Sequence, residues 1–236
     1  MKKGSLLLFL VLLIGCSSTT VIEKTPQEVM VASEAVLQMV QLTSKTASAN
    51  LAAKGVVDLK VGDVLSNSSL VFLNFIDEIP FFKRDLEDYL VQINTTISKI
   101  GNELSFFIEN NLLSEFAISD PFLLIEGDQT AISRHFASFA TNPIERWLLA
   151  KLEEDKKLFK MWETLERTFN TYIFSHAKMW PNEAKYKVQL VDEEPKNVIV
   201  VTVLRQFFTD MRSEEQLLRA MAPTYDDELF KLFVNH

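Results

Sequence analysis

The fold class of this chain is decided by residues 25–55, which read TPQEVMVASEAVLQMVQLTSKTASANLAAKG. Thr25 is a typical N-cap, Pro26 suits the first helical position, and Glu28 completes a capping box. Gly55 is the expected left-handed stop. The residues between these signals define one buried stripe at spacings of three and four: Val29, Ala32, Val36, Met39, Val40 and Thr43. The stretch therefore predicts one long amphipathic helix.

Helical spacing recurs along most of the chain that follows. We expect helices over residues 70–78, 82–116 and 151–174, and several short helices packed at angles over residues 121–157. Gly101 interrupts the second of these segments, and such a glycine either bends a helix or lets another backbone approach. The short helices are delimited by three breaks, at Ser119-Asp120-Pro121, Gly127-Asp128 and Asn142-Pro143.

The C-terminal third gives more ambiguous signals. Residues 198–204 are rich in β-branched side chains and favour a strand by propensity. The helical spacing of Val201, Leu204, Phe208 and Met211 nevertheless predicts a helix. Cap signatures at residues 213–216 and 224–227 predict two short final helices separated by Pro223.

The fold prediction is therefore an all-α, multi-helix bundle of long and short helices. It forms a single domain over residues 25–236. The alternating pattern near residues 186–191 leaves room for one short strand.

The first fifteen residues have the features of a lipoprotein signal peptide. Two lysines precede an apolar run over residues 6–14, which is shorter than the about 20 apolar residues that cross a bilayer. Leu13-Ile14-Gly15-Cys16 matches the bacterial lipobox, in which the cysteine thiolate receives a diacylglyceryl group before cleavage. An ordinary signal peptide with a chance cysteine is the alternative. We expect residues 1–15 to be removed, and residues 16–24 to form a lipidated cysteine and its tether.

Lipidation of Cys16 predicts attachment to a membrane that the chain does not span. Acyl chains such as palmitate anchor a protein with about 0.8 kcal/mol per buried methylene. Ser17 follows the cysteine, a pattern that in such lipoproteins indicates an outer membrane and a protein facing the periplasm. Cys16 is also the only cysteine, so the mature domain cannot form an internal disulfide or a thiolate metal site.

Composition excludes several function classes. With 47% hydrophobic and 24% charged residues, the chain has the composition of a folded globular protein. Its net charge of −8 argues against nucleic-acid binding, which needs a concentrated positive surface. No P-loop, Gly-x-Gly-x-x-Gly or Gly-x-Ser-x-Gly motif occurs. Because His135 and His176 lack partners at metal-binding spacings, we expect no metal and no cofactor.

Phenylalanine stands out, with 18 residues in the chain. Adjacent helical residues lie about 100° apart, so a doublet widens the apolar face of a helix. Aromatic side chains usually pack in cores, which is the first interpretation. The second is that Phe82, Phe107 and Phe208 line a cavity for an apolar ligand. These three are the second members of the doublets Phe81-Phe82, Phe106-Phe107 and Phe207-Phe208.

Carboxylates are abundant, and Glu126, Asp128, Glu214 and Glu215 could supply an acid and a base, but most of these four stand at positions typical of helix caps. Glu126, Asp128 and His135 form the one cluster that merits a test for catalysis. Glu215 and Arg219 are four residues apart, and we expect them to form a surface ion pair. We therefore predict no catalytic residue.

Three segments carry a resemblance to a known family. The first is Leu124-Ile125-Glu126-Gly127-Asp128-Gln129-Thr130-Ala131-Ile132-Ser133, and the second is Ala117-Ile118-Ser119-Asp120 with Asn94 upstream. The third runs over residues 204–233 and includes Glu214-Glu215, Leu218-Arg219 and Pro223. Together they resemble the bacterial exported proteins grouped as domain of unknown function 4197.

This resemblance implies an all-helical exported domain, and it supplies no catalytic residue because that family has no assigned activity. Of the family's Asn-Arg-Ala-Ala-Glu segment only Asn94 is kept, and its Ile-Pro-Leu-Pro becomes Val64-Leu65-Ser66-Asn67. At Gly127-Asp128 we expect a left-handed stop followed by an N-cap.

The sequence thus favours a lipid-anchored envelope protein that binds an envelope protein partner or has a structural role, without catalysis. A carrier or sensor of an apolar ligand such as a lipid is the alternative. An enzyme is the third hypothesis.

Overall fold

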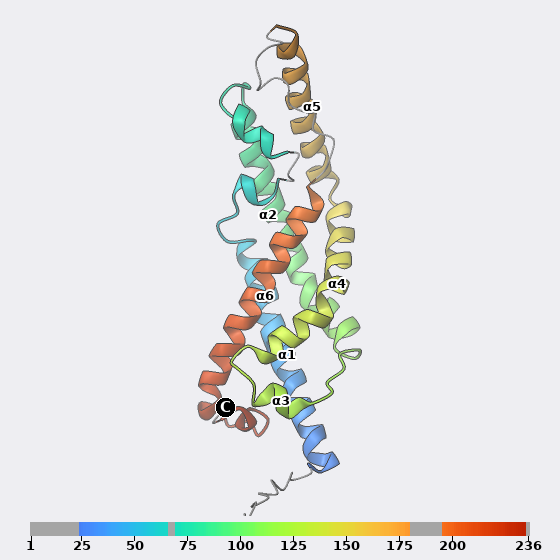
Figure 1. The fold of residues 1–236 in the computed structure, drawn as a ribbon, viewed down its shortest axis with the longest axis vertical. Helices are drawn as coiled ribbons and strands as arrows, with labels where there is room; N and C mark the ends of the chain where they lie inside the picture. Colours follow the sequence, from blue (N-terminus) through green and yellow to red (C-terminus); the bar gives the residue numbers. More distant parts are fainter. Residues whose placement is uncertain (1–23, 66–68, 180–194, 235–236) are drawn as a thin grey trace, which may run out of the picture.

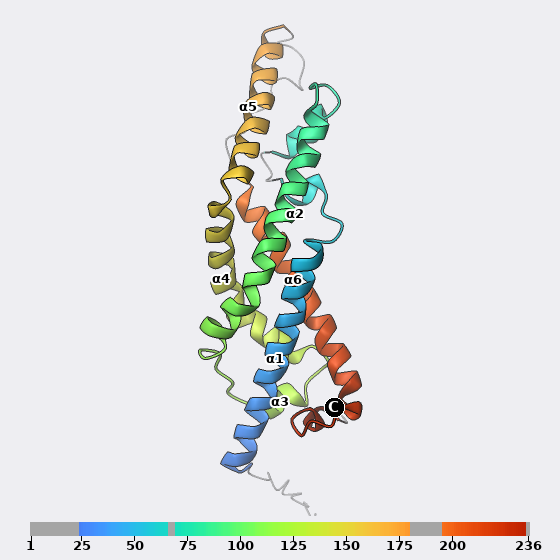
Figure 2. The same ribbon diagram turned by 180° about the vertical axis from the view of Figure 1, so that it is seen from behind.

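The computed structural model describes residues 24–65, 69–179 and 195–234. They form an elongated bundle whose long helices run near the long axis, as Figures 1 and 2 show from opposite sides. No strand occurs in these ranges, which confirms the all-α prediction. The α-helices are α1 (Pro26–Lys54), α2 (Phe82–Phe107), α3 (Pro121–Ile125), α4 (Ala131–Glu154), α5 (Lys156–Met179) and α6 (Lys196–Met221).

Short non-α segments complete the fold: the 3-10 segments η1 (Val61–Asp63), η2 (Leu70–Phe75), η5 (Ala222–Thr224) and η6 (Phe230–Phe233), and the π-helical η3 (Ile108–Leu112). The strand considered near residues 186–191 lies outside the described residues. Among the described helices, none combines the length and the apolar character that crossing a membrane requires.

Helix α1 has the boundaries that its sequence predicts. The Thr25 amide donates to Glu28 Oε2 at 2.7 Å and the Glu28 amide donates to Thr25 Oγ1 at 3.2 Å, which completes the capping box. At the other end Gly55 has a φ of 64° and donates its amide to the Leu51 carbonyl. Its buried stripe includes Ala32, Val36, Met39 and Val40, but the prediction is wrong for Val29, which is exposed in the first turn.

At Gly101 the backbones of α1 and α2 approach closely. A Cβ at this position would lie 2.5 Å from the Ala52 backbone nitrogen, so only glycine lets the two backbones meet there. Of the two roles expected for Gly101, the structure therefore shows the second. Asn94 lies on the same helix and accepts a hydrogen bond from the Val56 amide at 3.0 Å, just past the end of α1.

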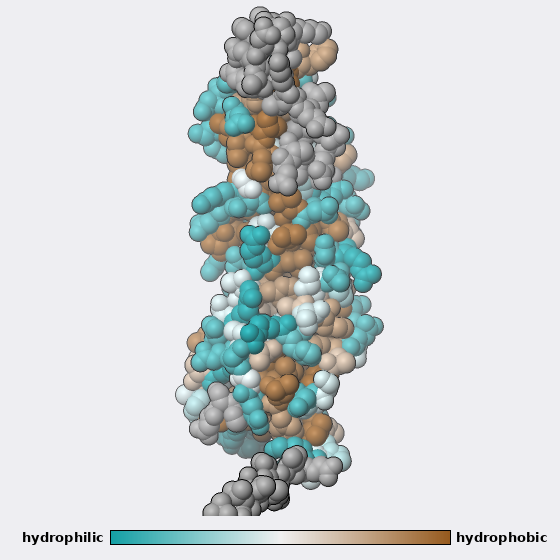
Figure 3. Space-filling model, viewed as in Figure 1, coloured by the Kyte–Doolittle hydropathy of each residue, from teal (hydrophilic) through white to brown (hydrophobic). Residues whose placement is uncertain are grey.

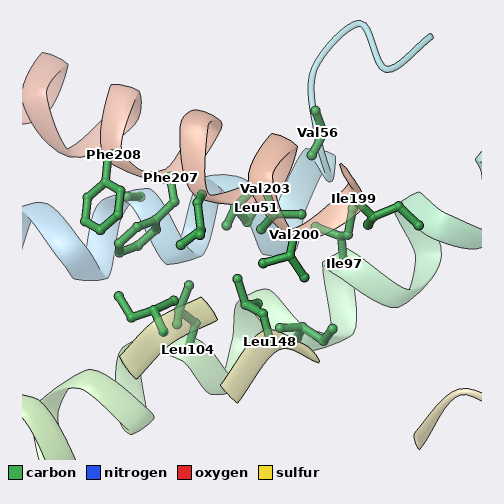
Figure 4. Packing of buried hydrophobic residues seen from close by; sticks show 14 of the residues in the cluster. Leu51, Val56, Ile97, Leu104, Leu148, Ile199, Val200, Val203, Phe207 and Phe208 are labelled. Atoms are coloured by element: carbon green, nitrogen blue, oxygen red, sulfur yellow. The ribbon is translucent and has the colours of Figure 1, made fainter. Parts of the chain in front are cut away.

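Helix α6 confirms the choice of helix over strand for residues 198–204. Its buried face, with Ile199, Val200 and Val203, packs against α1, α2 and α4 (Figure 4). Burial within a helical bundle outweighs strand propensity, because no neighbouring strand is there to pair with within the described residues.

Helices α4 and α5 differ from expectation at two points. The break expected at Asn142-Pro143 is wrong, since α4 continues through Pro143. Its ribbon changes direction along its length (Figure 1), as proline bends a helix by removing one backbone hydrogen bond. The single helix expected over residues 151–174 is instead divided at Asp155, between α4 and α5.

The C-terminal prediction also needs correction. Ser213 does not begin a helix, because α6 runs without interruption to Met221. The chain beyond Pro223 forms η6 rather than an α-helix. Phe230 and Phe233 of η6 are buried, so this end of the chain is part of the core.

Candidate functional site

The predicted lipidation site, Cys16, lies outside the described residues. The described chain begins at Lys24, and α1 begins at Pro26 at one end of the elongated bundle. In both ribbon views this end also holds α3 and the C-terminal segment, and the end of α5 points the opposite way (Figures 1 and 2). A tether joined to α1 therefore meets the bundle at its end.

Phe82, a candidate ligand-lining residue, lies in an aromatic cluster. It is fully buried, and its ring centroid lies 5.2 Å from that of Phe72 and 6.3 Å from that of Phe169. Phe72 also stacks on Trp162, at 5.6 Å between centroids. The cluster joins η2, the start of α2 and α5, so Phe82 has a packing role there.

Phe107 and Phe208 also pack against other aromatic side chains. Phe107 stacks on Trp147 of α4 with ring centroids 4.9 Å apart. Phe208 is buried and meets Phe207 edge to face, with centroids 5.2 Å apart. The structure does not bring Phe82, Phe107 and Phe208 together around one cavity, and the best-defined pockets of the described residues are lined by other side chains.

The most enclosed of these pockets is very small. It lies between α1, α2, α4 and α6, in the packing shown in Figure 4, and its volume is about 10 Å³. This is room for one water molecule, whereas small-molecule sites have volumes of about 300–1,000 Å³. Its lining is entirely apolar: Leu51, Ile97, Ile100, Leu148, Leu152, Val200 and Val203.

Glu126, Asp128 and His135 do not form a catalytic arrangement. Asp128 Oδ1 accepts hydrogen bonds from the Thr130 amide and hydroxyl, both at 2.9 Å, and these lower the pKa of Asp128. Asp128 also pairs with Arg134, and His135 Nε2 lies 3.4 Å from the Ala117 carbonyl oxygen. No hydrogen bond or ion pair joins the three residues in the described part of the chain.

The same region corrects the expectation for Gly127. It has no positive φ, so it is not a left-handed stop. Glycine is required because a Cβ would lie 2.7 Å from the Ala131 Cβ. The N-cap of α4 is Thr130 rather than Asp128.

Glu215 and Arg219 form a buried ion pair, so the surface pair expected from their spacing is wrong. Their side chains are 0% and 3% exposed, and Arg219 Nε donates to Glu215 Oε1 at 2.9 Å. Glu215 also accepts the amides of Ile132 and Ser133, at 3.1 and 2.7 Å, in the first turn of α4.

Arg219 completes this junction by binding the end of α3. Its two terminal nitrogens donate to the carbonyls of Ile125 and Leu124, at 2.7 and 2.8 Å. The guanidinium carbon also lies 5.0 Å from the centroid of the Phe233 ring. One ion pair on α6 therefore satisfies the end of α3 and the start of α4 together.

A second carboxylate, that of Asp155, occupies the junction between α4 and α5. Its Oδ1 accepts the amides of Lys157 and Leu158, at 2.9 and 3.0 Å. Its Oδ2 accepts hydrogen bonds from Gln92 and Thr96 of α2. Burial opposes ionisation of Asp155, but these hydrogen bonds outweigh it and hold its pKa below the ordinary value.

An open groove of about 340 Å³ runs between α2 and α5. Its walls carry acidic side chains from α2 and lysines from α5, and Met161 and Leu165 supply apolar surface. The sequence carries no local signal for this groove, because its opposing residues are about 70 positions apart: Asp85 and Asp88 on α2, and Lys157 and Lys160 on α5.

No group of three or more histidine, cysteine or acidic residues that could hold a metal ion occurs within the described ranges.

No family model, curated protein or solved structure matches this chain. The resemblance to domain of unknown function 4197 therefore stays a prediction.

Proposed function

We propose that this chain is an exported lipoprotein, anchored through lipidated Cys16, whose helical body acts as a non-enzymatic binding or structural module. Outer-membrane attachment facing the periplasm belongs to the same proposal. The observation that carries it is the lipobox at residues 13–16, which nine residues separate from the start of α1.

The place of α1 in the bundle supports anchoring. The helix begins at one end of the elongated body, so a tether there leaves the sides of the bundle free (Figure 1). A body attached by its end extends away from the membrane and can meet a partner at a distance from it.

The chemistry of the described residues supports a module without catalysis. Glu126, Asp128 and His135 do not meet at one point. The carboxylates of Glu215 and Asp155 already accept hydrogen bonds from the backbone amides at the starts of α4 and α5. A polar group saturated by backbone partners is poorly placed to act on a substrate. The small enclosed cavity also gives the apolar-carrier alternative no support.

The anchor is tested by metabolic labelling with a clickable fatty acid and by membrane fractionation. The parent chain is expected to take up label and to sediment with membranes, and Cys16→Ala is expected to do neither. Ser18→Ala is the matched control, because it alters the tether without removing the thiol. Equal labelling of the parent and Cys16→Ala would overturn the anchor.

The module is tested by crosslinking in intact cells that express the lipidated chain. A reproducible crosslinked product of defined mass is expected for the parent, and a much weaker one for the unanchored Cys16→Ala chain. If crosslinking gives no product above the monomer in either case, the binding role fails. A structural role would then require an envelope defect in cells lacking the chain.

A further inference from the structure

The end of the bundle where α1 begins carries exposed apolar side chains. In the first two turns of α1, Met30 is 56% exposed and Val29 is also exposed, and on α3 Leu123 is 70% exposed. Figure 3 shows apolar surface at this end, among hydrophilic residues. Single exposed apolar residues are ordinary on a protein surface. Val29, Met30 and Leu123 are of interest because they lie close to the predicted anchor.

Contacts place α1 and α3 side by side at this end. The Lys24 ammonium lies 4.6 Å from the centroid of the Phe122 ring, and Phe122 precedes Leu123 in α3. The start of α1 extends past α3 and the C-terminal segment in both ribbon views (Figures 1 and 2). Val29 and Met30 therefore belong to the part of the bundle nearest to the tether.

The tether is short compared with the bundle. Between Cys16 and Thr25 it has eight residues, which can span at most about 30 Å even when fully extended. An acylated Cys16 would thus keep the first turns of α1 within that distance of the lipid surface. Contact between these turns and the bilayer requires no rearrangement of the fold.

We propose that Val29, Met30 and Leu123 form a membrane-contacting tip, which rests on the bilayer that holds the Cys16 acyl chains. This inference relies on the proposed lipid anchor and adds to it a second, non-covalent attachment. Apolar side chains enter the interface, and the Lys24 ammonium lies at the depth of the phosphates. Glu28 and Asp120 at the same end disfavour anionic lipid, so a zwitterionic surface is the better partner.

The test uses the full lipidated chain, reconstituted in phosphatidylcholine vesicles. Because the one native cysteine, Cys16, is lipidated, a cysteine introduced elsewhere can be labelled alone with an environment-sensitive fluorophore. Met30→Cys and Leu123→Cys report on the tip. Val91→Cys is the matched control, since Val91 is 66% exposed but lies in the first half of α2, towards the opposite end of the bundle.

At positions 30 and 123 we expect emission shifted to shorter wavelength on vesicle binding, and quenching by spin-labelled lipid. Position 91 is expected to show neither. If the labelled chains float with the vesicles but all three positions stay in water, the contact is overturned and the anchor stands. If the chains do not float with the vesicles, the anchor fails and the contact fails with it.

Discussion

Two carboxylates in this bundle each cap the start of a helix, one from a distant part of the chain and one from the adjacent residue. Glu215 caps α4 from a different helix, is fully buried and has Arg219 as its counter-ion. Asp155 caps α5 from the preceding position in the chain, is half-buried, and is bound by the neutral side chains of Gln92 and Thr96.

The difference shows how distance along the chain changes the energetics of a cap. A local cap needs only the right residue at the start of the helix, and its loss typically costs about 0.5–2 kcal/mol. Glu215 reaches the start of α4 from another helix by carrying its charge into the core, where Arg219 is its counter-ion. Removal of one partner then leaves the other charge buried, at a typical cost of about 3–5 kcal/mol.

The largest expected effect comes from Arg219→Met, which breaks the buried pair. We expect the free energy of unfolding to fall by about 3–5 kcal/mol, because Glu215 would stay buried without its counter-ion. The carbonyls of Leu124 and Ile125 would also lose their donors. Equilibrium unfolding in urea measures the change.

Arg212→Met is the matched control, since Arg212 is exposed on the same helix and, among the described residues, donates only to Thr209. Its expected effect is within about 0.5 kcal/mol. Equal losses for the two variants would show that the buried pair stabilises the fold no more than a surface arginine does.

Asp155→Ala is expected to have the next largest effect. It removes a cap and two links to α2, so we expect a loss of about 1–2 kcal/mol in the same urea assay. Asp226→Ala, at an exposed carboxylate outside any helix, should leave stability unchanged. A loss as large as that of Arg219→Met would erase the distinction between the two junctions.

Acid should weaken the Asp155 junction selectively. The folded-state pKa of Asp155 lies below its ordinary value, so the unfolded chain takes up the proton first as the pH falls. The stability that ionised Asp155 contributes is therefore complete above about pH 5, and is lost as the pH falls below about 4. Urea unfolding from neutral to acidic pH should show the parent converging on Asp155→Asn; a constant difference between them would contradict this assignment.

The smallest expected effect is that of Asp128→Asn, at the exposed carboxylate near the start of α4. The amide oxygen of asparagine can still accept from the Thr130 amide, so the local turn is kept. We expect the thermal unfolding midpoint to match that of the parent. A clear decrease would mean that the exposed Arg134 pair stabilises α4 together with Glu215.

Local signals predicted the bounds of α1 and the helical state of α6, although they misplaced the bounds of α4 and α5. Thr25, Glu28 and Gly55 bound α1 as expected, because a cap depends on residues within one turn of each other. The helical spacing around Phe208 and Met211 likewise identified α6 despite its β-branched start. The burial of Glu215 also had a signal in the sequence, since it continues the stripe of Phe208, Met211 and Leu218.

Other boundaries followed from contacts that no local pattern contains. Pro143 does not end α4, because Ile144, Leu148 and Leu152 bury the following turns against the core. Asp155 divides the helix expected over residues 151–174, because α2 supplies the partners for its side chain. Neither outcome could be inferred from the residues on either side.

The sequence by itself therefore determined the fold class and the start and end of α1, since these depend on helical spacing and on caps formed by neighbouring residues. The tertiary structure alone decided that Glu215 and Arg219 join α3, α4 and α6, and that Phe82, Phe107 and Phe208 pack apart from one another. The physical reason is that burial and hydrogen bonding are satisfied between residues about 60–95 positions apart, and only the folded chain brings such residues into contact.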